Sequence, residues 1–237
     1  MKNKKVAFVG AEEHTRNNAP WDDESFDIWL VNEWAMESWV KRYTASIDIH
    51  WDFIYPDPQY DRGNGYWEWL QKPRGKPVYM QKKDPSVPDS VEYPLKAINK
   101  KFLSTLTYEG RPVRNFRTSV SYAIALALYQ NYEQIDIYGV ELTGIEYKGQ
   151  KSNFSFWIGV ATGLGVKVDL HCSQDSFVAP LYGYEAFMKD TRIMDYMNGL
   201  KQQIKEEEKK MNMLEGAYQL TVQMLENEQK NDTNTPE

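Results

Sequence analysis

The sequence predicts an α/β protein: a Rossmann-like, mostly parallel sheet with helices on both faces, followed by a long C-terminal helix or helical hairpin. Three observations predict this class. Short apolar runs alternate with helix-like segments along the first three quarters of the chain. These runs are almost continuously apolar, which is typical of strands buried on both faces of a parallel sheet. Beyond them, apolar residues recur every three or four positions among charged residues, as in an amphipathic helix.

The first part of the chain supplies four predicted strands. They are KVAFVGA (5–11), FDIWLVNEW (26–34), ASIDIHWDF (45–53) and KPVYMQ (76–81). A helical pattern covers 33–43, and a short helix is expected over 67–72. The segment between the third and fourth strands is rich in proline, glycine and tyrosine, which favours a long loop, and long loops in compact domains are often functional.

Two further strands and two helices are predicted in the next part. A hydrophobic helix over 117–132 leads into a strand over 134–140. A second helix, over 152–165, ends at a glycine and leads into a last strand over 166–171. This alternation of strand and helix indicates a parallel sheet.

From residue 184 the composition changes to that of an amphipathic helix, either single or a pair joined near Gly216. Its apolar stripe consists of Met197, Leu200, Ile204, Met211, Leu214, Tyr218, Thr221 and Leu225, with Glu207 as an interruption. Such a stripe suits a partner helix, so we expect a homo-oligomer; packing onto the chain's own domain is the alternative. The predicted organisation is a Rossmann-like nucleotide(-sugar)-binding domain (1–183), an amphipathic oligomerisation region (184–226) and a disordered tail (227–237).

The composition argues against several classes of protein. A formal charge of -6 disfavours a nucleic-acid partner, because phosphate contacts need clustered lysine and arginine. Cys172 is the one cysteine, so no intramolecular disulfide can form and a reducing compartment is expected. The first apolar run is too short for a signal peptide, and no stretch approaches the roughly 20 apolar residues of a membrane span. We therefore expect a cytoplasmic protein with no membrane partner.

The ends of the predicted strands define a candidate binding site, because ligands of open parallel sheets collect at the carboxyl ends of the strands. The residues that follow these strands are Gly10, Ala11 and Glu12; Asn32 and Glu33; Asp48, His50 and Asp52; Gly139 and Glu141; and residues 171–173. Thr118 and Ser119 belong to the same edge, because the hydrophobic helix that they open has to pack back on the sheet.

The start of the hydrophobic helix is a suitable seat for a phosphate. Its unpaired backbone N–H groups and dipole favour an anion, and the hydroxyls of Thr118 and Ser119 add donors. Serine and threonine are also ordinary N-cap residues, and Gly10 also suits a simple turn, so both interpretations stay open. The segment GAEEHTR lacks the G-x-G-x-x-G fingerprint, which argues against a classical NAD site, and we expect no cofactor.

The segment DIHWD is a candidate for acid–base chemistry. At strand spacing, Asp48, His50 and Asp52 point to one face, where the carboxylates favour the protonated imidazole. Such a cluster suits a general acid or base, part of a metal site, or a solvated edge without a catalytic role. The chain has three histidines and no H-x-x-x-H or C-x-x-C spacing, so we expect no metal site.

Three segments carry a resemblance to a known family. They are VAFVGAEEHTR (6–16), DIWLVN (27–32) and TSVSYAIALALYQNYEQIDIYGVEL (118–142). They resemble the bacterial sialyltransferases of glycosyltransferase family 42, in which a TSG segment is followed by an apolar helix, a glycine-ended strand and an acid. The related glycosyltransferase-like proteins linked to flagellin glycosylation are similar, as is a group of tailed-phage proteins with C-terminal helices. The family's glycine after TS is Val120 in this chain.

The resemblance implies a nucleotide-sugar site that needs no metal. By position, the residues implied to hold the nucleotide are Gly10, Asn32, Thr118 and Ser119, with Glu141 near the sugar. The histidine that is the family's general base would fall near YKGQKSN (147–153), where this chain has Gln150 and Lys151. His50, or an acid such as Asp48 or Glu141, would then have to accept the proton, with Lys151 or Tyr147 stabilising the leaving phosphate.

These expectations lead to one main hypothesis and two alternatives. The main hypothesis is a glycosyltransferase-like enzyme that transfers a sugar from a nucleotide sugar to an acceptor. The first alternative is a phage protein that sequesters a nucleotide without catalysis, in the host cytoplasm. The second is an assembly or adaptor protein whose C-terminal helices recruit a partner while the cleft is vestigial.

Overall fold

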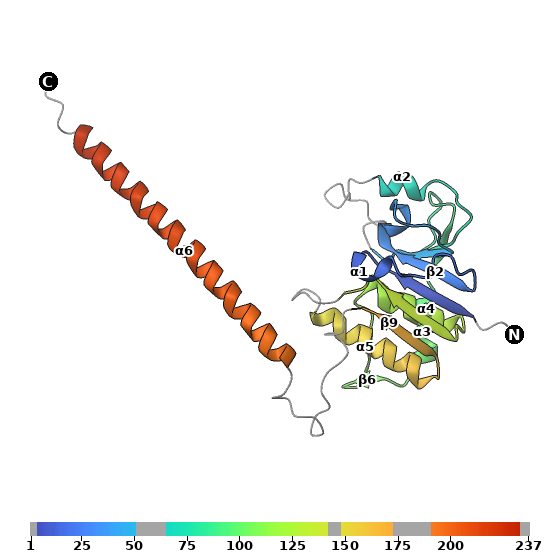
Figure 1. Cartoon of the computed structure of the whole chain (residues 1–237). Helices are drawn as coiled ribbons and strands as arrows, with labels where there is room; N and C mark the ends of the chain where they lie inside the picture. The colour runs from blue at the N-terminus through green and yellow to red at the C-terminus, as the bar shows by residue number, and fades with distance from the viewer. Residues whose placement is uncertain (1–3, 51–64, 142–147, 173–190, 233–237) are drawn as a thin grey trace. The chain divides into compact units, whose positions relative to one another are not determined.

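The computed structural model describes residues 4–50, 65–141, 148–172 and 191–232 (Figure 1). The chain divides into two compact units, Met1–Phe177 and Val178–Glu237. The first unit contains the sheet and its helices, and the second contains one long helix. Tyr147 lies outside the described residues, as does Asp52.

The first unit is built on a seven-stranded sheet with the strand order β5-β4-β3-β2-β1-β8-β9, and all neighbouring strands are parallel. The strands are β1 (Lys5–Val9), β2 (Phe26–Val31), β3 (Ala45–Ile47), β4 (Val78–Met80), β5 (Ser90–Glu92), β8 (Gln134–Tyr138) and β9 (Lys167–His171). The chain builds outward from β1 to β5 and then returns to place β8 on the other side of β1. The order therefore reverses between β1 and β8, and the predicted fold class is confirmed.

Helices and a small hairpin connect these strands. They are α1 (Glu13–Arg16), the 3-10 helix η1 (Asn32–Met36), α2 (Tyr66–Leu70), α3 (Leu95–Phe102), the hairpin β6 (Thr107–Tyr108) and β7 (Arg111–Pro112), α4 (Ser119–Tyr129) and α5 (Lys148–Gly163). The hydrophobic helix predicted over 117–132 is α4, and the helix predicted over 152–165 is α5. The helix expected over 33–43 is wrong in extent, because η1 ends at Met36.

Both faces of the sheet are covered. On one face, α4 and α5 pack with Val6 and Phe8 of β1 in the largest hydrophobic cluster, where Ile124 and Trp157 are fully buried. On the other face, Ala7 and Val9 of β1 pack against Trp21 and against η1. Neither face of a strand that is covered on both sides meets solvent, and this is the physical reason for its continuous apolar sequence.

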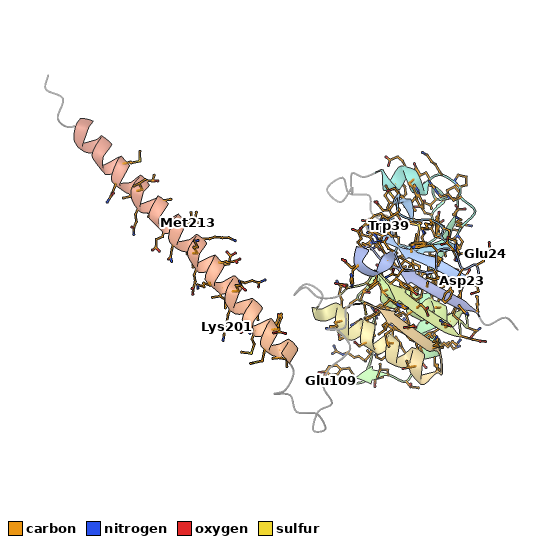
Figure 2. The ribbon with its side chains drawn as sticks, in the orientation of Figure 1. Asp23, Glu24, Trp39, Glu109, Lys201 and Met213 are labelled. Atoms are coloured by element: carbon orange, nitrogen blue, oxygen red, sulfur yellow. The ribbon has the colours of Figure 1, made fainter. Side chains whose placement is uncertain are left out.

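The second unit is one continuous helix, α6 (Thr191–Asp232), of 42 residues. It does not break at Gly216, so the single-helix alternative holds, and it includes 227–232, which the sequence analysis assigned to the tail. Its large apolar side chains are exposed, as Met213 illustrates in Figure 2. No helix among the described residues is long and apolar enough to cross a bilayer.

Candidate functional site

The carboxyl ends of the parallel strands form one edge of the sheet, here called the carboxyl edge. The strand order reverses between β1 and β8, and Gly10 and Gly139 directly follow these two strands at the carboxyl edge. A Cβ built on Gly10 would lie 2.3 Å from the carbonyl oxygen of Gly139. Gly139 also has a φ of +62°, and its N–H donates to Oγ1 of Thr15 at 2.7 Å. The two glycines are therefore required first of all by a backbone contact between two loops.

Ala11 and Glu12, two further predicted site residues, hold the turn after β1. The Ala11 carbonyl accepts a hydrogen bond from the Arg16 guanidinium. Glu12 is the N-cap of α1, with its carboxylate accepting from the N–H of His14 at 3.2 Å, and its own N–H donates to the Gly139 carbonyl at 3.0 Å. These contacts close the loop that borders the reversal point.

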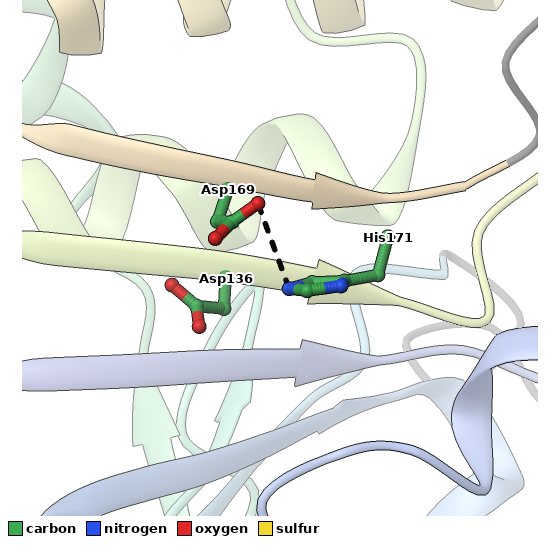
Figure 3. Close-up of side chains that lie close together, drawn as sticks. All are labelled: Asp136, Asp169 and His171. Atoms are coloured by element: carbon green, nitrogen blue, oxygen red, sulfur yellow. Dashed lines mark ion pairs between the residues drawn. The ribbon is translucent and has the colours of Figure 1, made fainter.

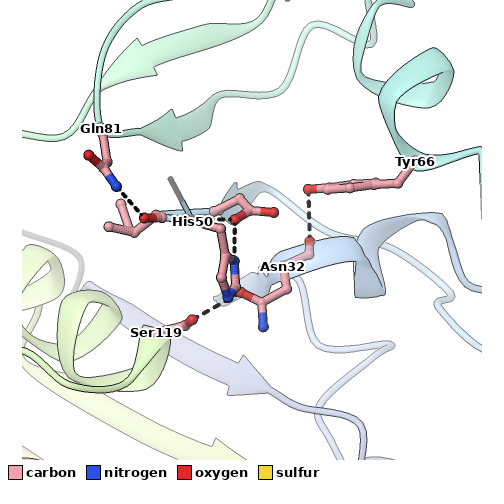
Figure 4. A network of polar contacts seen from close by, with 7 residues as sticks. Asn32, His50, Tyr66, Gln81 and Ser119 are labelled. Atoms are coloured by element: carbon pink, nitrogen blue, oxygen red, sulfur yellow. Dashed lines mark hydrogen bonds and ion pairs between the residues drawn. The ribbon is translucent and has the colours of Figure 1, made fainter. Parts of the chain in front are cut away.

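Asn32 and Ser119 meet directly at the carboxyl edge, as the sequence analysis predicts for residues of one site (Figure 4). The Ser119 hydroxyl donates to Oδ1 of Asn32 at 2.9 Å. Asn32 has a φ of +56°, a left-handed conformation that asparagine tolerates better than most residues. Its carbonyl accepts a hydrogen bond from the hydroxyl of Tyr66 at 3.0 Å, which ties the strained backbone to α2.

Of the two interpretations of Thr118, N-cap residue or ligand contact, the structure shows the first. It is the N-cap of α4, and its Oγ1 accepts from the N–H of Val120 at 3.0 Å and of Ser121 at 3.3 Å. Two of the amide donors at the helix start are therefore already satisfied within the protein. Ser119, the next residue, presents its hydroxyl outward to Asn32, so Ser119 is the better candidate for a ligand contact.

Asp48 and His50 form a hydrogen-bonded pair at the end of β3 (Figure 4). Nδ1 of His50 lies 2.7 Å from Oδ1 of Asp48, which also accepts from the His50 backbone N–H at 3.1 Å. The Asp48 side chain is fully buried, whereas the imidazole is 44% exposed. A buried carboxylate that holds one ring nitrogen orients the other, Nε2, and fixes the tautomer.

The Asp48–His50 pair lies next to the Asn32–Ser119 pair. Val31 pairs with Ile47 in the β2–β3 ladder, so Asn32 and Asp48, which directly follow them, leave neighbouring strands at the same level. The carboxyl edge therefore carries a hydroxyl–amide pair and an imidazole–carboxylate pair side by side.

His50 also lines a small pocket with the segment that follows β4. The pocket encloses about 160 Å³ and is bordered by residues 80–85, which include Lys82 and Lys83. The Gln81 side chain donates to the Ile49 carbonyl at 2.7 Å and holds this segment against the end of β3. Lys82 and Lys83 add positive charge to the pocket, and Asp84, which also lines it, offsets part of that charge. Neither lysine is among the site residues predicted from the sequence.

Glu141 and Lys151 both lie close enough to Cys172, at the other end of the carboxyl edge, for their charges to act on its thiol. Burial raises the pKa of the Cys172 thiol; the charge of Glu141 raises it further, and the charge of Lys151 opposes this. Gln150 and Lys151 lie in the first turns of α5, where Arg117 approaches as well: its Nη1 is 3.3 Å from the position of a Cβ on Gly149. Arg117, absent from the prediction, directly precedes the Thr118 cap.

The aromatic side chains of α2 serve packing. Tyr66 is 2% exposed and stacks on Trp69 with ring centroids 5.8 Å apart. The Arg74 guanidinium covers Trp69 at 3.7 Å from the ring centroid. Tyr66 nevertheless contributes indirectly to the site, because its hydroxyl holds the Asn32 backbone.

Comparison with known proteins gives structural neighbours but no sequence family. No family model matches the chain, and no curated protein matches it. The sialyltransferase CstII from Campylobacter jejuni, in complex with cytidine-5'-monophosphate, is similar with a TM-score of 0.43 at 16% identity, over 72% of this chain and 80% of that chain. The monofunctional α-2,3-sialyltransferase Cst-I from Campylobacter jejuni is similar with a TM-score of 0.45 at 14% identity, over 86% of this chain and 96% of that chain.

A protein of another class is similar too. Thiamine pyrophosphokinase from Bacillus subtilis has a TM-score of 0.41 at 13% identity, over 70% of this chain and 59% of that chain. Bacterial sialyltransferases, the family that the sequence segments resemble, are thus among the structural neighbours of this chain.

Proposed function

We propose that the protein is a glycosyltransferase-like enzyme that binds a nucleotide sugar at the carboxyl edge and transfers the sugar to an acceptor hydroxyl. One observation carries the proposal: the hydrogen-bonded Asp48–His50 pair lies beside the Asn32–Ser119 pair. The first pair can move a proton and the second can orient a polar ligand. The resemblance of three sequence segments to bacterial sialyltransferases supports the choice of a nucleotide sugar.

The nucleotide is assigned to the central part of the edge. Asn32 and Ser119 offer an amide and a hydroxyl to a ribose or a phosphate, and the start of α4 adds its dipole. Because Gly10 and Gly139 have no side chains, a ligand can approach the backbone of these two loops closely. Thr118 contributes by holding the first turn of α4 in place.

His50 is assigned the role of general base. Asp48 holds Nδ1–H, so Nε2 is the ring nitrogen that accepts the proton of the acceptor hydroxyl. The acceptor oxygen then forms a bond to the anomeric carbon as the bond from that carbon to the phosphate oxygen breaks. The electron pair of that bond leaves with the nucleotide, and His50 later returns its proton to solvent.

The cations near α5 are assigned to the leaving group. Lys151 and Arg117 would compensate the negative charge on the released phosphate, which is how a transferase can act without a metal ion. Glu141, on the same side of the edge, is assigned to the hydroxyls of the sugar. Tyr147 and Gln150 stay candidates for the same region through the resemblance alone.

Substitution of His50 tests the proposal. Incubation with CMP-, UDP-, GDP- and dTDP-sugars should release free nucleotide from one donor, and His50→Gln should lower that turnover by about 100-fold or more because general-base catalysis is lost. Calorimetric affinity for the nucleotide should change by no more than about threefold, since the ring is assigned to the acceptor. His14→Gln, at an exposed position on α1, is the matched control.

Two results would contradict the proposal. Unchanged turnover in His50→Gln would remove His50 from the mechanism. The absence of turnover with every donor, combined with tight binding of one nucleotide, would favour the alternative of a non-catalytic nucleotide-binding protein. One observation favours that alternative: Gln150 and Lys151, which cannot act as a base at neutral pH without unusual surroundings, occupy the region in which the resemblance implies a histidine.

We further propose that α6 associates with α6 of a second copy. The support is the row of exposed apolar side chains at heptad spacing, Met197, Leu200, Ile204, Met211, Leu214 and Tyr218. Lys210 and Glu215 flank this row with opposite charges, which complement each other across a helix pair. The single cysteine supports the cytoplasm as the compartment in which the protein acts.

A further inference from the structure

A group of three metal-ligand side chains lies on a face of the sheet, apart from the residues assigned to sugar transfer. Asp136 belongs to β8, and Asp169 and His171 belong to β9. One oxygen or nitrogen atom from each lies within 4.8 Å of the other two. Figure 3 shows the three side chains gathered over the same two strands.

The strand register is what brings the carboxylates together. In the β8–β9 ladder, Asp136 is paired with Asp169, so both project to the same face. Like charges directly opposite each other on neighbouring strands repel and destabilise a sheet. Asp136 is only 5% exposed and accepts a hydrogen bond from Nε2 of Gln134 at 2.9 Å, whereas the Asp169 side chain is 49% exposed, so solvent screens this repulsion only in part. A cation bound between the two carboxylates would turn the repulsion into attraction.

The imidazole of His171 is already oriented toward the carboxylates. The ring stacks on Tyr138, with centroids 4.1 Å apart and planes at 5°, so its direction is fixed. Nε2 is 3.7 Å from Oδ1 of Asp169, which is too far for a hydrogen bond. The His171 side chain is 36% exposed, but this nitrogen itself is shielded from solvent and has no hydrogen-bond partner within the described part of the chain. A buried nitrogen without a partner is costly unless something else uses its lone pair.

We propose that Asp136, Asp169 and His171 bind a divalent transition-metal ion of the Zn²⁺ or Mn²⁺ class. A neutral imidazole and two carboxylates balance the two positive charges and are the donor types these ions take. Ligand atoms about 2.1 Å from a tetrahedral zinc ion lie about 3.4 Å apart, so small side-chain rotations complete the site. The fourth position is left for water. Mg²⁺ and Ca²⁺, which prefer oxygen ligands, should bind more weakly.

Calorimetric titration of the full-length protein with Zn²⁺, after treatment with a chelator, tests the site. The wild-type protein should bind one ion per chain. Asp136→Asn and His171→Gln should each weaken binding by at least about tenfold, since each removes one ligand. His14→Gln removes an exposed histidine elsewhere and should leave the affinity unchanged. The absence of zinc binding, or equal affinity in all three variants, would overturn the proposal.

A second pair of measurements guards against a folding defect in the variants. Without metal, Asp136→Asn should unfold at the same temperature as the wild-type protein or above it, because it removes one of two opposed carboxylates. Zinc should raise the unfolding temperature of the wild-type protein and of His14→Gln only. Co²⁺ should give d–d absorption bands without a thiolate charge-transfer band; a strong thiolate band would make Cys172 a ligand and overturn the assigned set.

Discussion

At the scale of single residues, Gly139 gives the sharpest prediction. A Cβ there would lie 2.5 Å from the carbonyl oxygen of Gly10, and the φ of +62° strains any residue other than glycine. We expect Gly139→Ala to lower the free energy of unfolding by about 2–4 kcal/mol, because neither loop can move without breaking its hydrogen bonds. Chemical denaturation at neutral pH measures this change.

Gly75→Ala is the matched control for Gly139→Ala. Gly75 has a similar φ of +66°, but nothing lies within 4 Å of the position of its Cβ. Gly75→Ala should therefore lower the free energy of unfolding only by the conformational strain, about 1 kcal/mol. If the two substitutions were equally destabilising, the Gly10–Gly139 contact would contribute nothing to stability.

Tyr93 makes stability depend on pH in alkaline solution. Burial raises its pKa well above the ordinary 10.0, and its hydroxyl donates to the Tyr122 carbonyl at 2.9 Å. Above pH 10 the unfolded chain therefore releases this proton while the folded chain keeps it, so the free energy of unfolding falls as pH rises. Tyr93→Phe should lower the free energy of unfolding by about 1 kcal/mol at pH 8. Above pH 10, the free energy of unfolding of this variant should decline less steeply with pH than that of the wild-type protein. Denaturation curves at several pH values measure both effects; parallel declines would contradict the assignment.

The candidate site could be predicted from sequence only where its residues directly follow strands. Asp48 and His50 are two positions apart, so their pairing is visible in the sequence, and Asn32 and Ser119 follow from the sheet rule. Contacts that depend on register or on loop geometry could not be predicted. The pairing of Asp136 with Asp169 is the clearest case, because they are 33 positions apart and a shift of one residue would place them on opposite faces.

At the scale of elements, every strand of the seven-stranded sheet except β5 could be predicted, although β3 and β4 are shorter than the runs predicted over 45–53 and 76–81. Strands β1, β2, β8 and β9 begin at or within one residue of the predicted positions. Strand β5 has three residues, two of them exposed, so it lacks an apolar pattern. Helix α3 was missed as well, although Pro94 immediately before it is a usable start signal.

Helix α6 has one interruption in its apolar stripe, and filling it should strengthen association. Glu207 occupies the stripe between Ile204 and Met211, and Lys210 neutralises it at 2.6 Å. We expect Glu207→Leu to lower the dissociation constant of the oligomer by about 100-fold, because each of the two paired helices then buries one leucine side chain, worth about 1.5 kcal/mol. Sedimentation equilibrium measures the constant.

Glu206→Leu provides the control for Glu207→Leu. Glu206 carries the same side chain one position earlier, away from the stripe. It adds the same apolar area without continuing the stripe and should leave the dissociation constant unchanged. Equal effects of the two substitutions would point to nonspecific association rather than a helix pair.

At the scale of the whole molecule, the sheet unit and α6 should be separable. The hydrophobic clusters among the described residues draw only on positions between 6 and 170. A chain that ends at residue 190 should therefore unfold at the temperature of the sheet unit in the full chain, while light scattering shows a monomer. An aggregated product, or an oligomer of unchanged size, would contradict this division.

The two units also differ in their optical signals. All eight tryptophans lie between positions 21 and 157, so none belongs to α6. Helix α6 has 42 residues, whereas α5, the next longest helix in the part of the chain that the structure describes, has 16. Far-ultraviolet circular dichroism is thus weighted toward α6, whereas tryptophan fluorescence, excited at wavelengths that the α6 tyrosines Tyr196 and Tyr218 do not absorb, reports on the sheet unit alone. A single heating experiment followed by both signals can assign each transition to its unit without a label or a truncation.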